Sequence, residues 1–122
     1  MNENNRQLLE GCGIDYKEGV EKFLDEEELY CGLLVDFLTE NTFDEAKRCL
    51  AESDTEGFLR AVHAMKSVTG TLSMNGLYRL CVESVDKLRS GDTKSAAELF
   101  ERAYEVYEQI SEGIRDTLIH NS

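Results

Sequence analysis

The chain has 122 residues, 41% of them apolar and none of them proline, and its formal net charge at pH 7 is −12. This length and composition fit one domain, residues 1 to 122, with a packed core, and they exclude a disordered chain. The negative charge disfavours nucleic acid and anionic membrane surfaces as partners, and no apolar run reaches the roughly 20 residues that span a bilayer.

The first third of the chain predicts three helices. A short helix is expected over residues 4 to 10, and the polar N-terminal segment lacks a signal-peptide core, which indicates a cytosolic protein. Asp15 is expected to start a second helix that runs to about Leu24. Asp25 and Glu28 resemble a capping box, so a third helix should follow to about Glu40. Its expected inward residues are Leu29, Leu33, Leu34, Phe37 and Leu38.

Two further capping boxes divide the middle of the chain. Thr42 with Glu45 predicts the start of one helix, and Ser53 with Glu56 predicts the start of the next. The second of these helices should run to about Leu72.

The last third of the chain predicts two more amphipathic helices. Ser73 could cap the first, Gly91 should end it, and Asp92 should cap the second, which keeps a three-four apolar spacing over about six turns. No segment shows the alternation typical of a strand. We therefore expect an all-α protein, an antiparallel four-helix bundle with short additional N-terminal helices, and a monomer.

The cysteines give no sign of a metal or cofactor. They are spaced too far apart for a known zinc pattern, and thiols of a cytosolic protein stay reduced. We interpret them as small apolar residues and expect neither a metal nor a cofactor. The four residues are Cys12, Cys31, Cys49 and Cys81.

One helix face between residues 58 and 72 differs in kind from the rest of the chain. The core stripe of this helix falls within about 80° on a helical wheel, and His63 points roughly 140° away from Phe58. Ser67 and Gly70 lie on the same outer face, and both are small. The predicted core stripe is Phe58, Val62, Met65, Thr69 and Leu72.

The residues that flank His63 suit phosphoryl transfer. A neutral imidazole is a good nucleophile toward phosphorus, and a cation stabilises the charge that spreads over the phosphoryl oxygens. Lys66 follows His63 by three residues and Arg60 precedes it by three, while Leu59 is expected to be an exposed apolar contact for a partner. A lone surface histidine is more often only a solvated side chain, and an interior glycine such as Gly70 often marks tight helix packing.

The run HAMKSVTGTL, residues 63 to 72, resembles the H-x-L-K-G segment of histidine-containing phosphotransfer domains. The resemblance covers about residues 13 to 90. Ser67 and Ser73 stand where the family has glycines, and Met65 stands where leucine is common. Further matching residues are Gly13, Ile14, Asp15, Gly19, Phe23, Asp25, Glu28, Leu29, Tyr30, Leu33 and Phe37 upstream, and Leu77, Leu80, Cys81 and Leu88 downstream.

The resemblance implies a four-helix bundle in which His63 accepts the phosphoryl group and Lys66 assists. It implies receiver domains of response regulators or hybrid kinases as partners, with Leu59, Arg60, Ser67 and Gly70 at the contact. The expected function is a phosphorelay intermediate that takes phosphate from a receiver aspartate and passes it to another. This would be a phosphocarrier and not an enzyme, because the chain has no nucleotide-binding motif.

Two other functions stay open at this point. A helical adaptor could dock receivers or other signalling proteins without carrying phosphate. A di-iron bundle would need Glu-x-x-His pairs, but Arg60 and Thr117 stand three residues before His63 and His120. The sequence does not identify the cognate kinase or regulator, the output, the direction of phosphate flow, or whether the domain belongs to a larger hybrid protein.

Overall fold

The predicted fold class is confirmed by a computed structural model, which describes residues 1–120. This part of the chain is all-α and contains no strand. No helix within residues 1–120 is long and apolar enough to cross a membrane. The elements are α1 (Glu3–Cys12), α2 (Tyr16–Lys22), α3 (Glu27–Phe37), α4 (Thr42–Ala51), α5 (Thr55–Thr71), α6 (Asn75–Arg89), α7 (Thr93–Ile114) and a π-helical turn, η1 (Arg115–Ile119).

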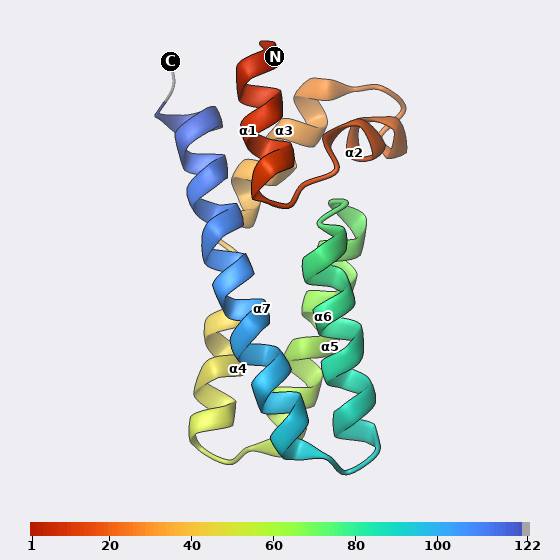
Figure 1. Cartoon of the computed structure of the whole chain (residues 1–122), viewed down its shortest axis with the longest axis vertical. Coiled ribbons are helices and arrows are strands. Elements are labelled where there is room, and N and C mark those ends of the chain that lie inside the picture. Colours follow the sequence, from red (N-terminus) through yellow and green to blue (C-terminus); the bar gives the residue numbers. More distant parts are fainter. Residues whose placement is uncertain (121–122) are drawn as a thin grey trace.

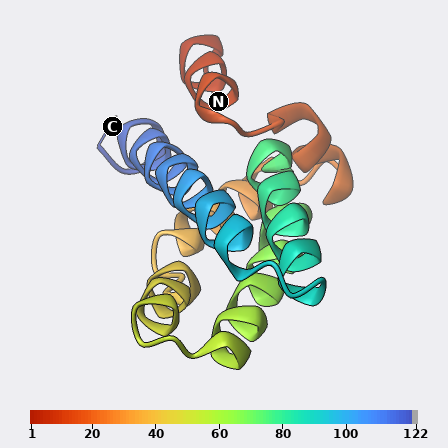
Figure 2. The same cartoon turned by 60° about the horizontal axis from the view of Figure 1, so that its bottom comes forward.

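Helices α4 to α7 form the antiparallel bundle, and α1 to α3 are stacked at one end of it (Figure 1). Within the bundle α4 packs on α5, α5 on α6 and α6 on α7. The view toward the far end of the bundle shows these four helices around a common axis, with the N-terminal helices beyond them (Figure 2). Helix α7 is long enough to continue past the bundle and to pack against α1 and α3.

The bundle is filled by aromatic and aliphatic side chains. Phe58 of α5 and Phe100 of α7 meet edge to face at 5.3 Å between ring centroids. Phe43 of α4 stacks on Tyr107 of α7 at 4.1 Å. Burying each of these rings removes a large apolar area from water and contributes about 1.5–3 kcal/mol or more to the stability of the fold.

Helices α1 to α3 form an N-terminal layer, and three hydrogen bonds join this layer to the end of α5. The amide of Asp15 donates to the Ser73 carbonyl (2.9 Å), the Tyr30 hydroxyl to the Leu72 carbonyl (2.5 Å) and the Lys22 ammonium to the Gly70 carbonyl (2.8 Å). Carbonyls at a helix C-terminus lack partners within the helix. The layer therefore completes the end of α5 while it positions α2 and α3 beside that helix.

The boundaries of several helices differ from the sequence prediction because the serines taken as caps end the preceding helix instead. Ser53 and Ser73 have positive φ values of 58° and 57°. The residue after each one donates its amide five positions back, as in a Schellman motif: Asp54 to Cys49 and Met74 to Thr69. The predicted capping roles of Ser53 and Ser73 are therefore wrong.

Two other predicted capping boxes are also absent. Asp25 has a φ of 62° and lies before the N-cap of α3, Glu26, which makes no side-chain capping bond. Thr42 is the first helical residue of α4 and not its cap. By contrast Asp15 and Asp92 do cap their helices, each through a side-chain oxygen that accepts an amide three residues on.

Most of the inward face predicted for helix α3 is confirmed: Leu34 and Phe37 are buried, and Leu33 and Leu38 pack against the core. The prediction is wrong for Leu29, which is 48% exposed, and it missed Tyr30, which is fully buried. The Tyr30 ring lies where a Cβ of Gly19 would be, at 2.1 Å from the ring carbon Cζ. Close packing of α2 on Tyr30 therefore sets the rotation of α3. The four cysteines are free thiols, Cys49 and Cys81 buried and Cys12 and Cys31 partly so, as expected for small apolar residues.

Candidate functional site

Helix α5 holds His63 on the surface of the bundle. Its N-terminus is fixed by Asp54, whose carboxylate accepts the Gly57 amide at 3.0 Å. A Cβ on Gly57 would lie 2.4 Å from that carboxylate, so the cap requires glycine here. The cap and the absence of proline favour an uninterrupted helix, and this helix places His63 on one face of the bundle.

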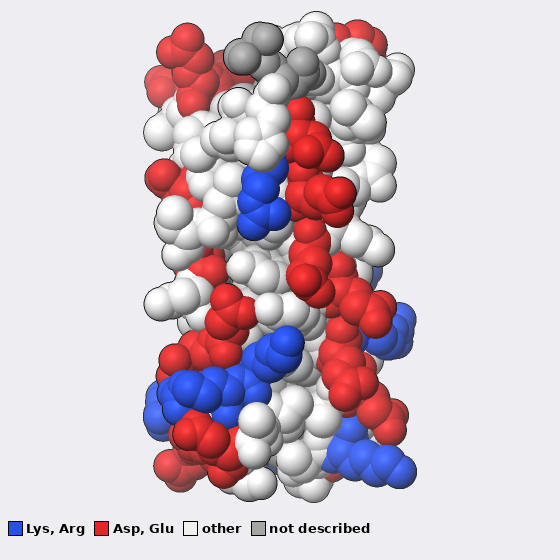
Figure 3. Space-filling model, turned by 90° about the vertical axis from the view of Figure 1, so that its left-hand side faces the viewer, with Lys and Arg blue, Asp and Glu red and all other residues white. Residues whose placement is uncertain are grey.

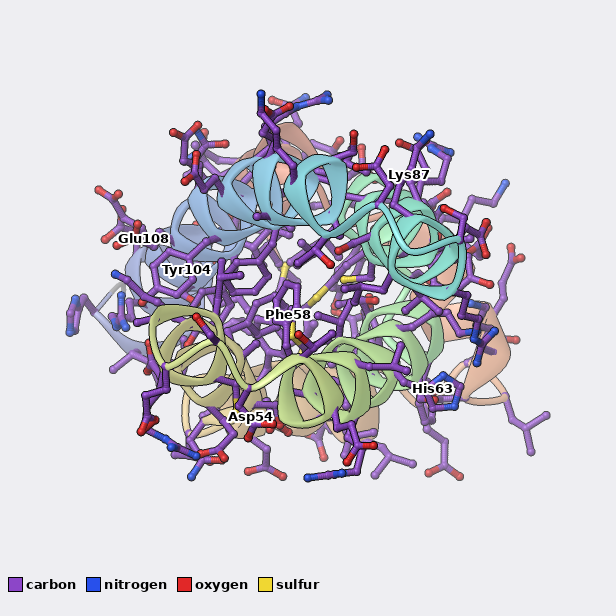
Figure 4. The ribbon with its side chains drawn as sticks, turned by 90° about the horizontal axis from the view of Figure 1, so that it is seen from below. Asp54, Phe58, His63, Lys87, Tyr104 and Glu108 are labelled. Carbon is purple, nitrogen blue, oxygen red and sulfur yellow. The ribbon has the colours of Figure 1, made fainter. Side chains whose placement is uncertain are left out.

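The predicted core stripe of α5 is confirmed. Phe58 points into the bundle while His63 points away from it (Figure 4). Because the opposite side of the helix is anchored in the core, the imidazole is exposed on a rigid element. No hydrogen bond or ion pair within residues 1–120 engages the imidazole. The buried residues of the stripe are Phe58, Val62, Met65, Thr69 and Leu72.

The two cations predicted beside His63 lie on its two flanks. Arg60 is exposed and Lys66 is partly exposed, and neither forms an ion pair with a carboxylate in the part of the chain that the structure describes. Arg48 of α4 behaves differently, because Glu45 and Glu52 both bind its guanidinium. Lys66 and Arg60 are therefore available for an incoming anion, whereas Arg48 is not.

Arg60 and Lys66 are not equivalent in position. Arg60 lines a depression of about 320 Å³ between α4 and α5, together with Glu45 and Arg48. On the wheel it flanks His63 on the side opposite Lys66. Lys66 lies on the other side of His63, away from α4.

The two small residues on the outer face, Gly70 and Ser67, have different surroundings. A Cβ on Gly70 would lie 3.1 Å from the ring of Tyr78 on α6, so a larger residue here would press against that ring. Ser67 is exposed and borders a groove between α3 and α5. Packing against Tyr78 is thus one reason for Gly70, whereas the structure gives no packing reason for Ser67.

Leu59 does not have the exposure predicted for it. Its side chain is partly buried and packs against the core. The prediction that Leu59, one turn before His63, is exposed on the outer face is therefore wrong. The apolar surface near His63 comes instead from the groove beside Ser67.

That groove is the feature that the sequence did not reveal. It has a volume of about 340 Å³ and is formed where α2, α3 and α5 meet. Its residues come from three separate segments, so no local motif could have identified it. We call it the α3–α5 groove; its lining residues are Phe23, Leu33, Asp36, Phe37, Glu40, Ser67, Val68, Thr71 and Leu72.

One column of negative charge lies on the side of the bundle opposite His63. The outer face of α7 carries exposed glutamates at three- and four-residue spacing, and carboxylates form a continuous column on this side of the molecule (Figure 3). Figure 4 places Glu108 of α7 and His63 on opposite sides of the bundle. The α7 carboxylates are Glu98, Glu101, Glu105, Glu108 and Glu112. The acidic column of α7 therefore does not border the imidazole of His63.

Comparisons with protein families, with characterised proteins and with solved structures find no match to this chain.

Proposed function

We propose that the protein is a phosphorelay intermediate that accepts a phosphoryl group on His63 from a receiver-domain aspartyl phosphate and passes it to another receiver. The observation that carries the proposal is a single arrangement on α5. An exposed imidazole without intramolecular partners lies on a rigid helix between two cations that have no carboxylate partner within the described chain. The motif around His63 supports the same function.

The chemistry needs few groups from this protein. A nitrogen lone pair of the His63 imidazole attacks phosphorus and forms the N–P bond. The P–O bond of the aspartyl phosphate breaks, and its electron pair leaves with the aspartate carboxylate. Transfer onward is the reverse step, with a carboxylate of the next receiver as the nucleophile. The partners' sites must come within bonding distance, so an exposed position on a rigid helix is required.

Lys66 is the proposed assisting cation. Phosphoryl oxygens carry their largest shared charge during transfer, and an ammonium beside the histidine stabilises that charge. Because no carboxylate within residues 1–120 neutralises Lys66, its full charge is available to the phosphoryl group. Arg60 is assigned a lesser part, since it borders α4 on the other flank.

A second function is favoured by the α3–α5 groove. An apolar groove of about 340 Å³ could dock a partner whether or not His63 reacts. The protein would then be a helical adaptor for receivers or other signalling proteins. The two functions differ in one observable, which is covalent phosphate on the histidine.

The test is label transfer from a panel of phosphorylated receiver domains to the wild type, to His63→Gln and to His120→Gln. His120 is the other histidine of the chain and is exposed at the end of η1, so its replacement is the matched control. We expect label on the wild type and the control, none on His63→Gln, and loss of label in acid. Equal labelling of His63→Gln, or label that survives acid, rules the proposal out.

In the proposed function the protein carries a phosphoryl group between receivers and does not take one from ATP. Incubation with ATP and Mg²⁺ alone should therefore leave the protein unlabelled. A receiver that binds the wild type tightly but never labels it would support the adaptor.

A further inference from the structure

The first turn of α6 begins with the dipeptide Asn75-Gly76. Asn75 is the only asparagine of the chain that is followed by glycine. Asparagine is chemically labile because the backbone nitrogen of the next residue can attack its side-chain carbonyl carbon, and glycine hinders that attack least since it has no side chain. Asn75 is partly exposed and Gly76 is exposed, and a Cβ on Gly76 would meet nothing within 4 Å. Packing within the chain therefore does not cover the dipeptide.

The amide that would attack is free of hydrogen bonds. Within residues 1–120 no acceptor engages the Gly76 amide. The carbonyls three and four residues before it, of Ser73 and Leu72, accept hydrogen bonds from Asp15 and Tyr30 of the N-terminal layer. The Gly76 amide therefore loses no hydrogen bond when it turns toward the side chain before it.

The first turn of α6 is also weakly capped. Its N-cap is Met74, which makes no side-chain capping bond, whereas α5 and α7 each begin with a capping aspartate. Uncapped helix ends fray more than capped ones. Fraying lets Asn75 leave the helical conformation and bring its side-chain carbonyl carbon to the Gly76 nitrogen, which ring closure requires.

The reaction consumes only water. The Gly76 nitrogen gives up its proton and forms a bond to Cγ of Asn75, the bond from Cγ to the side-chain nitrogen breaks, and that nitrogen leaves with the proton as ammonia. The product is a cyclic succinimide. Water then opens the ring. Opening at Cγ gives aspartate, and opening at the backbone carbonyl carbon gives isoaspartate, whose main chain contains an additional carbon.

We propose that Asn75 is a site of spontaneous covalent modification, at which isoaspartate lengthens the backbone in the first turn of α6 and loosens the N-terminal layer. The inference goes beyond the proposed function and involves none of the residues assigned to phosphoryl transfer. Asn75 lines a depression of about 460 Å³ with Gly13 and with Lys17 of α2, so it borders the layer directly. An additional main-chain carbon shifts the turn whose carbonyls bind Asp15 and Tyr30, and those hydrogen bonds should then open more often.

The first experiment ages the wild type at physiological temperature and pH and follows its asparagines by peptide mass spectrometry. Isoaspartate is identified by an isoaspartate-specific methyltransferase. Gly76→Ala is the matched variant, because its methyl group would meet nothing within 4 Å and alanine favours the helix. Asn41 is the control within the chain, since it is exposed but is followed by Thr42, whose branched side chain hinders ring closure.

We expect Asn75 to be converted before Asn41, and conversion in Gly76→Ala to be roughly tenfold slower than in the wild type. Isoaspartate should be among the products. The inference is overturned if Asn75 stays intact over several weeks, if Asn41 reacts as fast, or if the wild type and Gly76→Ala react at equal rates.

The second experiment measures the effect on the N-terminal layer by hydrogen exchange. Anion exchange isolates the modified protein, which carries one more negative charge, and Asn75→Asp supplies the same charge on a normal backbone. Amides of α2 and α3 should exchange faster in the modified protein than in Asn75→Asp, while those of α4, which packs on α5 and α7, should not differ. Equal exchange of α2 and α3 in these two proteins, or equally faster exchange in α4, overturns the inference.

Discussion

The inner and outer faces of α5 are built from the same helix under opposite constraints. On the inner face Phe58, Val62 and Met65 are each at most 1% exposed, so volume and shape decide which residues fit. On the outer face His63 and Ser67 are exposed, so packing in the core does not decide which residues fit there. The fold explains the residues of the inner face, so the unexplained residues of the outer face are the ones to test for function.

The largest expected effect concerns the inner face. Phe58→Ala removes a ring that packs on Phe100, and it should lower the free energy of unfolding by about 3–5 kcal/mol. His63→Gln removes an exposed side chain and should change it by less than about 0.5 kcal/mol. Denaturant unfolding of the two variants measures the contrast. Comparable losses in both would mean that His63 belongs to the packing of the fold.

The next effect concerns Ser67. Ser67→Gln should hold a docked receiver away from His63, and misplacement of about 1 Å can slow transfer on the order of a hundredfold. Glutamine has good helix propensity, so the melting temperature should stay near that of the wild type. Rates with a phosphorylated receiver and with phosphoramidate give the test. We expect only the first to fall; if both fall alike, the substitution acts on His63 itself, and if neither falls, the partner does not bind this face.

Lys66 should show a smaller effect on rate. Lys66→Ala is expected to slow transfer roughly tenfold, because the site is open to water and one charge contributes less there than in a closed site. Stability should change by no more than about 0.5 kcal/mol. Single-turnover rates from a phosphorylated receiver measure the difference. Transfer at the wild-type rate would show that Lys66 has no part in the chemistry.

The smallest effect is expected at Gly70. Gly70→Ala gains about 1 kcal/mol of helix propensity but presses a methyl group against Tyr78, which is 37% exposed and can move outward. We expect the free energy of unfolding to stay within about 1 kcal/mol of the wild type. Gly32→Ala is the control, because its Cβ would meet nothing within 4 Å, and it should add about 0.5–1 kcal/mol.

Transfer rates of Gly70→Ala separate the two explanations for this glycine. If packing alone accounts for it, receiver transfer should be close to normal. A stable Gly70→Ala protein that no longer exchanges phosphate with receivers would restore the partner contact that the sequence predicted.

Periodicity predicted the helices and the buried side of α5 well, because a long amphipathic helix repeats its signal over several turns. Capping was predicted less well. Ser53 and Ser73 are polar residues between helices, but each adopts a positive φ that ends the helix before it. A serine between two helices can cap the second helix or end the first, and the backbone conformation decides which of these it does.

The outer face was predicted in part. His63 and Ser67 are exposed as expected, but Leu59 is partly covered, because a wheel gives directions on one helix and not the position of its neighbours. The α3–α5 groove could not be predicted for the same reason. It depends on the rotation of α3, and that rotation follows from the contact between Tyr30 and Gly19.

The central claim, that His63 carries the phosphoryl group, is tested most directly on the protein itself. Protein labelled with ¹⁵N in its histidines is treated with phosphoramidate, and the imidazole signals of His63 and His120 are followed by NMR. We predict that a His63 ring nitrogen acquires coupling to ³¹P, that His120 is unchanged, and that acid restores the original His63 signals. Unchanged His63 signals in protein that has gained phosphate would contradict the account.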